Sequence, residues 1–374
     1  MVIPQRTALV HHWLVASRGG ERVLEALAQL FPFADLFTLV CDRSKIPNSL
    51  RSRHVRSSFL QHFPNATRWY RYYLPLFPLA TSRMDLTDYD LIVSSDAATV
   101  KGVSGGGATH ICYCHTPMRY VWSGYETYHR MAGTFSRHAL HAVRERLCRW
   151  DYAAAQRVTL FVANSRNVQK RIADCYGRQS QVIYPPVDTH RFQPSIALMP
   201  EAASFLVVSP LVPYKRVDIL VEAFNKCRRK LVVIGDGPER RKLESRAGPT
   251  VRFLGPQSDD EVVRAMQQCA AFVFAGEEDF GIVMAEAQAC GKPVIAFRRG
   301  GAAEIVDPGV SGLLFSEQSV DCLIDALDRF DRTSFDPVAI RASALRFSRE
   351  RFLREFSSIV ANRGQAPRTP NSEL

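Results

Sequence analysis

Two carboxylates and a glycine stand close together in EEDFGIVMAEAQACGKPV, residues 277–294. Glu278 precedes Gly281, and Glu286 follows inside an apolar run. If that run is a helix starting near Gly281, the amides of Gly281 and Ile282 are uncapped donors suited to a phosphate. A carboxylate accepts two hydroxyl hydrogen bonds at once, as a sugar or a ribose offers. The order predicts a sugar-holding carboxylate, phosphate-holding amides and a ribose-holding carboxylate; helix capping by the acids and a salt-bridged Glu286 are the alternatives.

A lysine and a glycine pair mark two further turns that could hold an anion. In VVSPLVPYKRVDIL (residues 207–220), Lys215 and Arg216 fall where a strand gives way to a helix. A cation at a helix start opposes the helix dipole, which favours a bound anion there over a solvent-facing lysine. In ASRGGERVLEAL, Gly19 and Gly20 let the backbone approach a ligand, although a tight turn alone explains such a pair equally well.

Several cofactor signatures are absent from the sequence. No G-x-G-x-x-G follows a strand, which argues against a dinucleotide cofactor. No G-x-x-x-x-G-K-[ST] occurs, which excludes a P-loop. No D-x-D ends a predicted strand. We therefore expect neither a cofactor nor a metal requirement.

Short apolar runs alternate with amphipathic segments along the whole chain. The amphipathic segments include RVDILVEAFNKC and DDEVVRAMQQC. Apolar strands separated by helices indicate parallel sheets covered on both faces, and hence two doubly wound α/β domains. The predicted strands are residues 7–10, 36–40, 91–94, 110–114, 160–163 and 182–184 in the first half, and 205–208, 231–234, 251–254, 271–274 and 294–296 in the second.

The chain of 374 residues is longer than one hydrophobic core usually supports. The consecutive prolines of YPPVDTHRF, residues 184–192, mark the boundary because they forbid helix and stiffen a connection. In FSRERFLREFSSIV, we expect Phe347, Phe352 and Phe356 to share one helical face. The predicted organisation is an N-terminal domain over 1–186, a C-terminal domain over 187–345, a helix over 346–362 packing back on the N-terminal domain, and a frayed tail over 363–374.

The net charge of +11 is concentrated in the first half of the chain. Residues 1–190 hold 23 Lys/Arg against 13 Asp/Glu (+10), and residues 191–374 hold 25 against 24 (+1). Residues 43–83 contain eight Lys/Arg, seven aromatic residues and no Asp or Glu. Basic side chains attract anionic lipid, and Trp and Tyr prefer the headgroup level, which favours docking on an anionic membrane surface over a merely solvated basic face. No nucleic-acid motif accompanies the charge, so we expect no nucleic-acid partner.

The nine cysteines are scattered, and their odd number argues against a disulfide framework. The only close pair, C-Y-C, is too tight for the usual zinc hook. The N-terminus, MVIPQRTALVHHWLV, lacks the long apolar segment of a signal peptide, and no run approaches the roughly 18 to 20 apolar residues of a spanning helix. We expect a cytoplasmic protein, peripheral on the inner face of the plasma membrane.

Taken together, these segments resemble a known family. EDFGIVMAE, GKPVIAFRRGGAAEIV and GLLF, with RGGERVLEAL, CYCHTPMRYVW, LVPYKRVDILVEAFN and LVVIGDGPERRKLE before them, resemble the retaining glycosyltransferases of family GT4. The resemblance spans nearly the whole chain and implies the GT-B fold, in which two Rossmann-like domains face a central cleft. HHWLV, HTPMRYVW and VPYKRVD are most similar to bacterial mannosyltransferases of lipopolysaccharide or exopolysaccharide assembly. That subgroup implies a GDP-mannose donor and a lipid-linked saccharide acceptor.

The resemblance implies roles for the residues of the opening stretch. Glu278 would contact the transferred hexose, and Glu286 the ribose of the donor nucleotide. Backbone amides at Phe280, Gly281 and Ile282 would meet the sugar and the diphosphate.

Further roles fall outside that stretch. Lys215, with Arg216 beside it, would neutralise the diphosphate leaving group. Gly19 and Gly20 would close on the donor from the other domain. His115 would lie near the reacting sugar and the acceptor, unless it is a structural histidine at a strand end.

One position departs from the family pattern. An Arg usually precedes the Leu of SPLVPYK, whereas this chain has Pro210, which supplies neither charge nor N–H. One diphosphate contact is therefore lost, and Arg216 is a candidate replacement. A nucleotide-sugar epimerase of GT-B-like fold and an inactive nucleotide-sugar-binding paralogue remain alternatives. The donor base and sugar, the acceptor, the linkage and the oligomeric state stay open.

Overall fold

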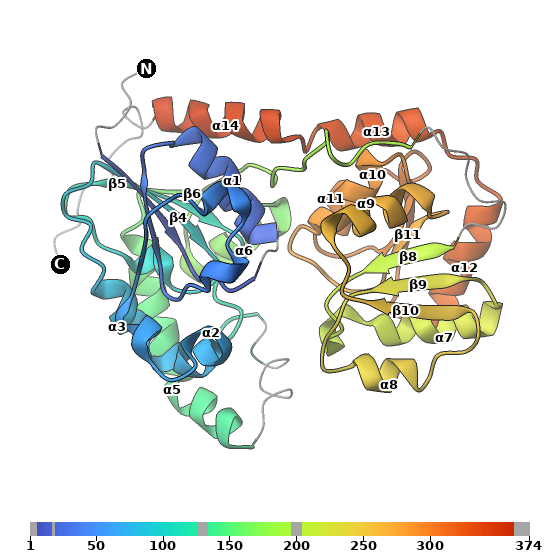
Figure 1. Ribbon diagram of the computed structural model, residues 1–374, viewed down its shortest axis with the longest axis horizontal. Coiled ribbons are helices and arrows are strands. Elements are labelled where there is room, and N and C mark those ends of the chain that lie inside the picture. Colours follow the sequence, from blue (N-terminus) through green and yellow to red (C-terminus); the bar gives the residue numbers. More distant parts are fainter. Residues whose placement is uncertain (1–5, 17–18, 124, 126–133, 196–203, 363–374) are drawn as a thin grey trace. The chain divides into compact units, whose positions relative to one another are not determined.

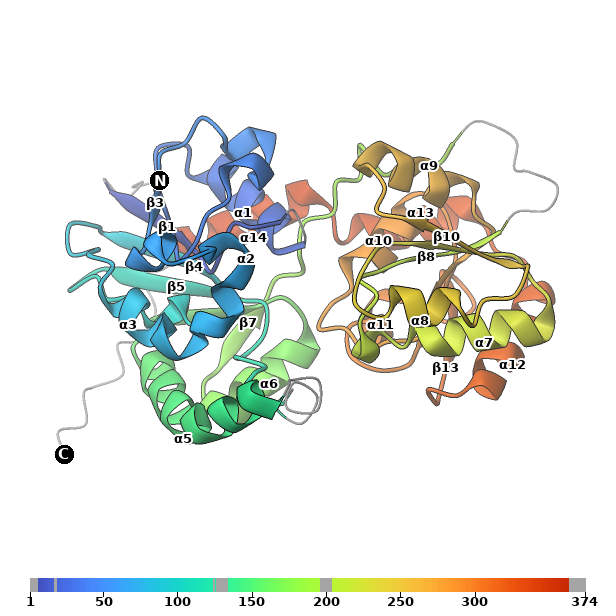
Figure 2. The same ribbon diagram turned by 60° about the horizontal axis from the view of Figure 1, so that its bottom comes forward.

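The computed structural model describes residues 6–16, 19–123, 125, 134–195 and 204–362. The chain divides into two compact units (Figures 1 and 2). Unit 1 consists of Met1–Pro186 together with Glu350–Leu374, and unit 2 consists of Val187–Arg349. The tail predicted to fray, residues 363–374, lies outside the described residues.

Unit 1 is built on a seven-stranded sheet in which every pairing is parallel. The strand order is β3-β2-β1-β4-β5-β6-β7. The central strands β1 and β4 are buried along their length, with apolar residues before the polar residues at their carboxyl ends, as expected for a parallel sheet covered on both faces. The strands are β1 (Thr7–His11), β2 (Asp35–Thr38), β3 (Val55–Ser57), β4 (Leu91–Asp96), β5 (Thr109–Cys114), β6 (Leu160–Ala163) and β7 (Ser180–Val182).

The two edge strands differ from the sequence prediction. β3 was not predicted, because an edge strand of three partly exposed residues carries no apolar run. β7 starts and ends two residues earlier than predicted, and the prolines at 185 and 186 account for its early end, because they offer no N–H to extend the ladder.

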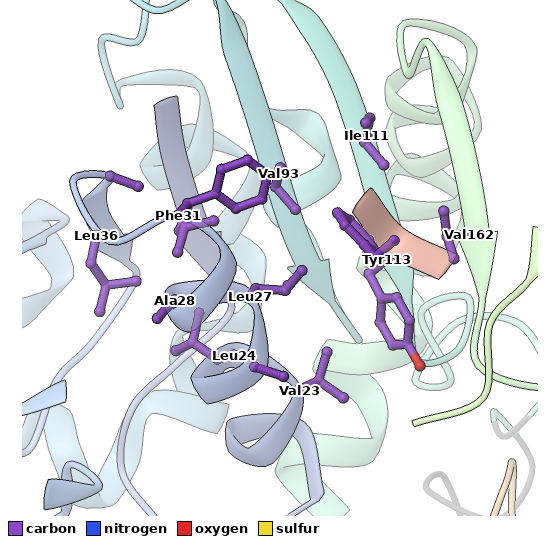
Figure 3. Close-up of a cluster of buried hydrophobic side chains, with 14 of the residues drawn as sticks. Val23, Leu24, Leu27, Ala28, Phe31, Leu36, Val93, Ile111, Tyr113 and Val162 are labelled. Atoms are coloured by element: carbon purple, nitrogen blue, oxygen red, sulfur yellow. The ribbon is translucent and has the colours of Figure 1, made fainter. Parts of the chain in front are cut away.

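One face of the unit 1 sheet is covered by α1 (Gly19–Leu30) and α14 (Arg349–Asn362). Figure 3 shows the α1 side chains Val23, Leu24 and Leu27 in the cluster that also includes Val93 and Ile111 of the sheet. The hydrophobic burial of each such side chain stabilises the unit by about 1.5–3 kcal/mol. This face of the core therefore joins the start of the chain to its last described helix.

The opposite face of this sheet is covered by the segment between β3 and β4 and by α5 (Thr134–Gln156), with α6 (Arg166–Tyr176) near β6. The former segment, predicted from its composition to be basic and aromatic, folds into short turns and helices. These are η3 (Phe59–His62), α2 (Ala66–Trp69), η4 (Tyr70–Leu76) and α3 (Phe77–Ser82). η1 (Arg43–Lys45) and η2 (Asn48–Leu50) lie earlier, between β2 and β3, and η5 (Val100–Gly102) follows β4.

The three phenylalanines near the end of the chain do not share one helical face. Phe352 and Phe356 belong to α14 and are fully buried in unit 1. Phe347 instead packs edge-on against Phe280 in unit 2, with ring centroids 5.3 Å apart. The prediction was wrong because the backbone of Val187 pairs with the chain at Phe347 and Arg349, which interrupts the helix before α14 begins.

Unit 2 is a six-stranded parallel sheet in the order β10-β9-β8-β11-β12-β13. Its strands are β8 (Phe205–Val208), β9 (Leu231–Ile234), β10 (Val251–Gly255), β11 (Phe272–Phe274), β12 (Val294–Phe297) and β13 (Gly312–Phe315). Helices cover both faces of this sheet (Figure 1). The helices and turns are η6 (Pro213–Lys215), α7 (Val217–Cys227), α8 (Arg240–Glu244), α9 (Asp259–Gln268), α10 (Ile282–Ala289), α11 (Ala302–Ile305), α12 (Val320–Asp331) and α13 (Pro337–Leu345).

The two sheets confirm the predicted class of two doubly wound α/β domains. Eleven of the strands correspond to predicted runs. β13 was not predicted as a strand, because its GLLF segment served only as a mark of the family resemblance. Within the described part of the chain, no helix is both long enough and apolar enough to cross a bilayer. All nine cysteines are free thiols.

Candidate active site

The predicted residues of unit 2 gather where its strand order reverses. β8 pairs with β9 on one side and with β11 on the other, so successive crossovers leave this point in opposite directions. In open α/β sheets, ligands bind beyond the carboxyl ends of the strands at such a switch point. Lys215 follows β8, and Glu278 follows β11.

The side chains of Lys215 and Glu278 form an ion pair, with Nζ donating to Oε1. Lys215 is only 6% exposed, and Nζ lies 5.3 Å from the ring centre of Tyr214 and 5.7 Å from that of Phe274. Aromatic faces attract a cation electrostatically and exclude water around it. The ammonium is thus held in a largely apolar setting in which a nearby negative charge interacts strongly.

The loop that carries Glu278 is fixed through its backbone. Glu278 forms an isolated parallel bridge with Gly300, and its carbonyl accepts the N–H of Gly301 at 2.9 Å. A Cβ at Gly300 would overlap the carbonyl oxygen of Glu278, and one at Gly301 would overlap that of Phe280. Two glycines in RRGG therefore allow the close backbone approach that sets the position of Glu278.

Gly281 lies at the N-terminus of α10 with φ +93°, a conformation that favours glycine. No side chain caps this end of the helix, so the amides predicted to meet a phosphate are not used by a capping group. Glu286 lies in the second turn of α10 and is 2% exposed. Phe280 is buried and Ile282 is half-buried.

Arg216 and Pro210 take different places in the loop after β8. Arg216 has a left-handed backbone, φ +52°, and its guanidinium pairs with Asp218 at 3.1 Å. Arg216 is therefore engaged locally. Pro210 is exposed, and its carbonyl accepts the N–H of Val212 and the hydroxyl of Ser209.

The predicted residues of unit 1 also gather at a switch point, between β1 and β4. His115 follows β5, and its Nε2 lies 2.8 Å from the hydroxyl of Ser95 at the end of β4. The same hydroxyl lies 3.0 Å from Nδ1 of His11 at the end of β1. His12 contacts the Ser95 carbonyl through its Nδ1 at 3.0 Å, and its ring lies 4.1 Å from that of His11.

Gly20, in the first turn of α1, lies against all three imidazoles. A Cβ there would stand 3.5 Å from His11, 3.6 Å from His12 and 3.7 Å from His115, all ordinary contact distances. The structure thus brings Gly20 and His115 together, with Gly19 adjacent in α1.

Burial opposes a positive charge on two rings of this cluster. Burial, with the neighbouring His11 second, lowers the pKa of His12 to about 4. Burial likewise lowers the pKa of His115 well below its ordinary value. In the part of the chain that the structure describes, no three His, Cys, Asp or Glu side chains are grouped so as to hold a metal ion.

A buried charge network supports the end of β4. The Asp96 carboxylate accepts the N–H groups of Ala98 and Val100, both at 3.0 Å, and it pairs with Lys101 at 3.1 Å. Lys101 also pairs with Asp151 at 2.5 Å. The carbonyl of Asp96 accepts the N–H of His115, so this network positions the histidine through the backbone.

The sequence prediction missed His11, His12, Ser95 and Glu21 as members of the site. HHWLV was used only as a mark of resemblance. The sequence did contain an indication of this site, because polar residues stand at the ends of three predicted strands. Sequence alone does not show that these strand ends are neighbours.

Family models match both halves of the chain. Residues 17–191 match the model described as Glycosyltransferase Family 4, and residues 188–334 match that of Glycosyl transferases group 1. A GDP-mannose-dependent α-(1-6)-phosphatidylinositol monomannoside mannosyltransferase of Mycobacterium tuberculosis is 34% identical over 194 residues, which are 44% of this chain and 50% of that protein. A D-inositol 3-phosphate glycosyltransferase of Mycobacterium marinum is 32% identical over 173 residues, which are 41% and 37% of the two chains. The chain therefore spans no more than half the length of these curated relatives.

Solved structures are similar over nearly the full chain. The structure of HepE from Anabaena with UDP-glucose has a TM-score of 0.72 at 19% identity and covers 95% of this chain and 99% of that one. Sucrose-phosphate synthase from Thermosynechococcus elongatus has a TM-score of 0.69 at 19% identity, covering 97% and 100%. These neighbours are GT-B glycosyltransferases, so the predicted fold class is confirmed. With its two domain matches running together from residue 17 to residue 334, the chain belongs to the GT4-type glycosyltransferase family.

Proposed function

We propose that the chain transfers a hexose from a nucleoside diphosphate sugar, with retention at the anomeric carbon. The observation that carries this proposal is the Lys215–Glu278 pair at the switch point of unit 2, next to the uncapped N-terminus of α10. Such a site can supply a cation and backbone amides to a diphosphate, and a carboxylate to a sugar.

In this proposal, Lys215 changes partner when the donor binds. Its ammonium turns from Glu278 to the diphosphate, while the amides of Gly281 and Ile282 receive the phosphate oxygens. Negative charge grows on the departing diphosphate in the transition state, and a prearranged cation and amides stabilise it without reorganising. Glu278, released from the pair, accepts hydrogen bonds from the hexose, and Glu286 holds the ribose.

The proton of the acceptor hydroxyl goes to the departing phosphate in the front-face reaction that the family resemblance implies. The bond from the anomeric carbon to the phosphate oxygen breaks as the bond to the acceptor oxygen forms on the same face. His115 and Gly20 of unit 1 serve the same reaction by orienting the sugar. A nucleotide-sugar epimerase would instead release a free isomerised sugar, which product analysis distinguishes.

GDP-mannose is the donor that we propose. The support is the resemblance to mannosyltransferases and the matching mycobacterial relative whose printed name specifies GDP-mannose dependence. A thermal-shift panel of GDP-, UDP-, ADP- and dTDP-sugars tests it, because a ligand at 100 times its Kd stabilises the fold by about 2.7 kcal/mol. Stabilisation by a UDP-sugar alone would overturn the choice of base but not the transferase.

Two variants test the assignment of the carboxylates. Glu278→Ala should abolish most turnover, and Glu286→Ala should mainly weaken donor binding, as donor titrations would show. Glu222→Ala is the control, because Glu222 is an exposed carboxylate of unit 2 that pairs with Arg246. Wild-type turnover and donor affinity in both site variants would contradict the proposed roles.

We further propose that the acceptor is a lipid-linked saccharide of bacterial surface polysaccharide synthesis, reached from the inner face of the plasma membrane. The support is a basic aromatic surface made of exposed residues of α2, η4 and α3. Trp69 is 44% exposed and Tyr72 is 71% exposed, and Arg68 and Arg71 are exposed beside them. Not every basic residue of this stretch belongs to the surface, because Arg53 donates to the backbone carbonyls of Ala28, near the end of α1, and of Ala34.

Vesicle sedimentation tests this surface. Replacing Arg68 and Arg71 with Gln and Trp69 with Ala should release the protein from vesicles containing anionic lipid, since each arginine contributes about 1 kcal/mol. Arg252→Gln with Arg264→Gln removes two exposed arginines from unit 2 as a control for charge. Unchanged binding of the triple variant would refute the surface as a membrane contact.

A further inference from the structure

The loop between β11 and α10, residues 275–281, is held on one side by backbone contacts. The carbonyl of Glu278 in this site loop accepts the N–H of Gly301 at 2.9 Å. Gly301 also passes so close to Phe280 that a Cβ there would overlap the Phe280 carbonyl. Because Gly301 stands directly before α11, the N-terminal end of α11 holds the backbone of the site loop.

The site loop is held a second time through the ring of Phe280. Phe280 is 3% exposed and packs edge-on against Phe347, with ring centroids 5.3 Å apart and ring planes inclined by 75°. Such pairs add a preferred geometry to the burial of apolar surface. Phe347 is fully buried, and its carbonyl accepts the N–H of Val187 at 2.8 Å. The position of Phe347 therefore restricts that of Phe280, the residue directly before Gly281.

Arg346 connects Phe347 to the C-terminal end of α11. The guanidinium carbon of Arg346 lies 4.9 Å from the centre of the Phe347 ring, within cation–π distance. Its Nη2 donates to the carbonyl of Ile305, the last residue of α11, at 3.0 Å. The same nitrogen lies 3.1 Å from the carboxylate of Asp307. Arg346 is thus fixed by groups at and just beyond the end of this helix.

Together these contacts form a closed frame around the site loop. The N-terminal end of α11 meets the loop at its backbone, and the C-terminal end meets the Phe280 ring through Arg346 and Phe347. α13, which leads into Arg346, packs against α10, the helix that the loop enters (Figure 1). Binding sites need such support, because their functional groups must stay within about 0.5 Å of the productive geometry.

We propose that Phe347 is a positioning residue for the donor site, supported by Arg346. By fixing Phe280, Phe347 sets the direction of the N-terminal amides of α10 and the position of the Glu278 carboxylate before a ligand arrives. Its ring is fully buried, so it acts through Phe280 and not by touching the ligand. The frame is a feature of unit 2 alone, whereas its effect on a diphosphate sugar rests on the proposed function.

Hydrogen exchange of the full-length chain tests the frame without a ligand. In Phe347→Leu, the Gly301 N–H should exchange about tenfold faster, because its acceptor at Glu278 is held less firmly and the loop opens locally. NMR of protein labelled with ¹⁵N-glycine resolves this amide.

Phe224→Leu is the matched control for hydrogen exchange. Phe224 is also fully buried in unit 2, and its ring pairs edge-on with that of Phe205 at 5.3 Å, at the end of β8 away from the site. Phe224→Leu and Phe347→Leu should lower the thermal midpoint alike, but only Phe347→Leu should accelerate exchange at Gly301. Equal exchange rates at Gly301 in the two variants would overturn the proposal.

Donor titration by calorimetry tests the effect on the site. The probe is GDP-mannose, or the nucleotide sugar that stabilises the wild type most in the thermal-shift panel. Phe347→Leu should raise the donor Kd about tenfold, and Phe280→Leu should do the same. Because one contact is broken in either case, the double variant should bind no more weakly than each single variant. Additive losses would refute an action of Phe347 through Phe280.

Arg346→Gln tests the same frame if Phe347→Leu does not fold. The side chain of Arg346 is 41% exposed, so its replacement leaves the core intact. Loss of the contacts with α11 should accelerate exchange at Gly301 by about threefold. Arg229→Gln is the control, because Arg229 likewise donates to a helix carbonyl, that of Leu327, just before β9. An unchanged rate at Gly301 in Arg346→Gln would overturn the closed frame.

The two measurements keep this proposal separate from the proposed function. If the wild type binds no nucleotide sugar, the proposed function fails, and faster exchange in Phe347→Leu still supports the frame. If the wild type binds a donor and Phe347→Leu accelerates exchange at Gly301 without changing the donor Kd, the positioning role is refuted and the donor site is not.

Discussion

The two units place their functional residues at the same topological position but use opposite chemistry there. In unit 1, the switch point between β1 and β4 holds a cluster of buried imidazoles joined by a serine. In unit 2, the switch point between β8 and β11 holds an ion pair beside an uncapped helix end. One architecture therefore presents mainly imidazole and hydroxyl groups in one copy and a lysine–carboxylate ion pair in the other.

This difference matches what each site can do when a ligand arrives. A lysine that is paired with a carboxylate can change partner to an incoming anion. Burial lowers the pKa of His12 and His115, so these rings are costly to protonate and are suited to orienting uncharged hydroxyl groups. The comparison predicts that unit 2 binds and activates the charged leaving group while unit 1 orients sugar.

Acid distinguishes the two units most strongly. His12 and His110 have pKa values of about 4 in the folded chain against 6.5 for an ordinary histidine, in both cases because of burial. The unfolded chain therefore binds more protons between these values, so the stability of unit 1 is full above pH 6.5 and is lost as the pH falls toward 4. Each such shift corresponds to about 3 kcal/mol.

Urea unfolding measures this loss. All four tryptophans lie in unit 1, so their fluorescence reports its unfolding, while hydrogen exchange in β8 and β9 reports unit 2. The tryptophan midpoint should drop between pH 7 and pH 4.5, and β8 and β9 should keep their stability. Equal losses in both units would contradict the comparison.

The second largest effect should come from the charge of unit 2. Lys215→Met keeps the length of the side chain but removes the ammonium, so kcat for transfer should fall by about 10²–10³, as when one oxyanion donor is lost. Lys242→Met, which removes an exposed lysine from the same unit, should leave kcat unchanged. A loss below tenfold in Lys215→Met would show that the helix amides alone stabilise the leaving group.

Glycines sharpen the comparison further, because they act differently in the two units. Gly301→Ala would force a Cβ onto the carbonyl of Phe280, and overpacking of this kind costs about 1–3 kcal/mol of stability. Gly20→Ala makes only ordinary contacts, so the thermal midpoint should be unchanged while donor or acceptor affinity falls. Normal sugar transfer by Gly20→Ala would contradict the prediction that a ligand approaches the backbone of unit 1 at Gly20.

The sequence predicted unit 2 more completely than unit 1, and the reason is physical. Glu278, Gly281 and Glu286 belong to one strand–loop–helix segment, so spacing along the chain places them together. His11, Ser95 and His115 end three strands far apart in the sequence, and their proximity depends on strand order. No local pattern specifies that order, and the same limit hid the role of Gly300 and Gly301 in fixing Glu278.

The smallest expected effect concerns Pro210, the one departure from the family pattern in unit 2. Pro210 contributes only its carbonyl to local hydrogen bonds, and any residue keeps that group. Pro210→Arg should therefore fold normally and, by adding one charge-assisted contact, strengthen donor binding by about 1–2 kcal/mol. Pro210→Ala restores the backbone N–H without adding a charge. This variant should bind the donor as the wild type does, so any gain in Pro210→Arg comes from the charge. If sugar transfer occurred only in Pro210→Arg, the wild-type chain would be a nucleotide-sugar binder, because Lys215 and the amides of α10 would then suffice for binding but not for stabilising the leaving group.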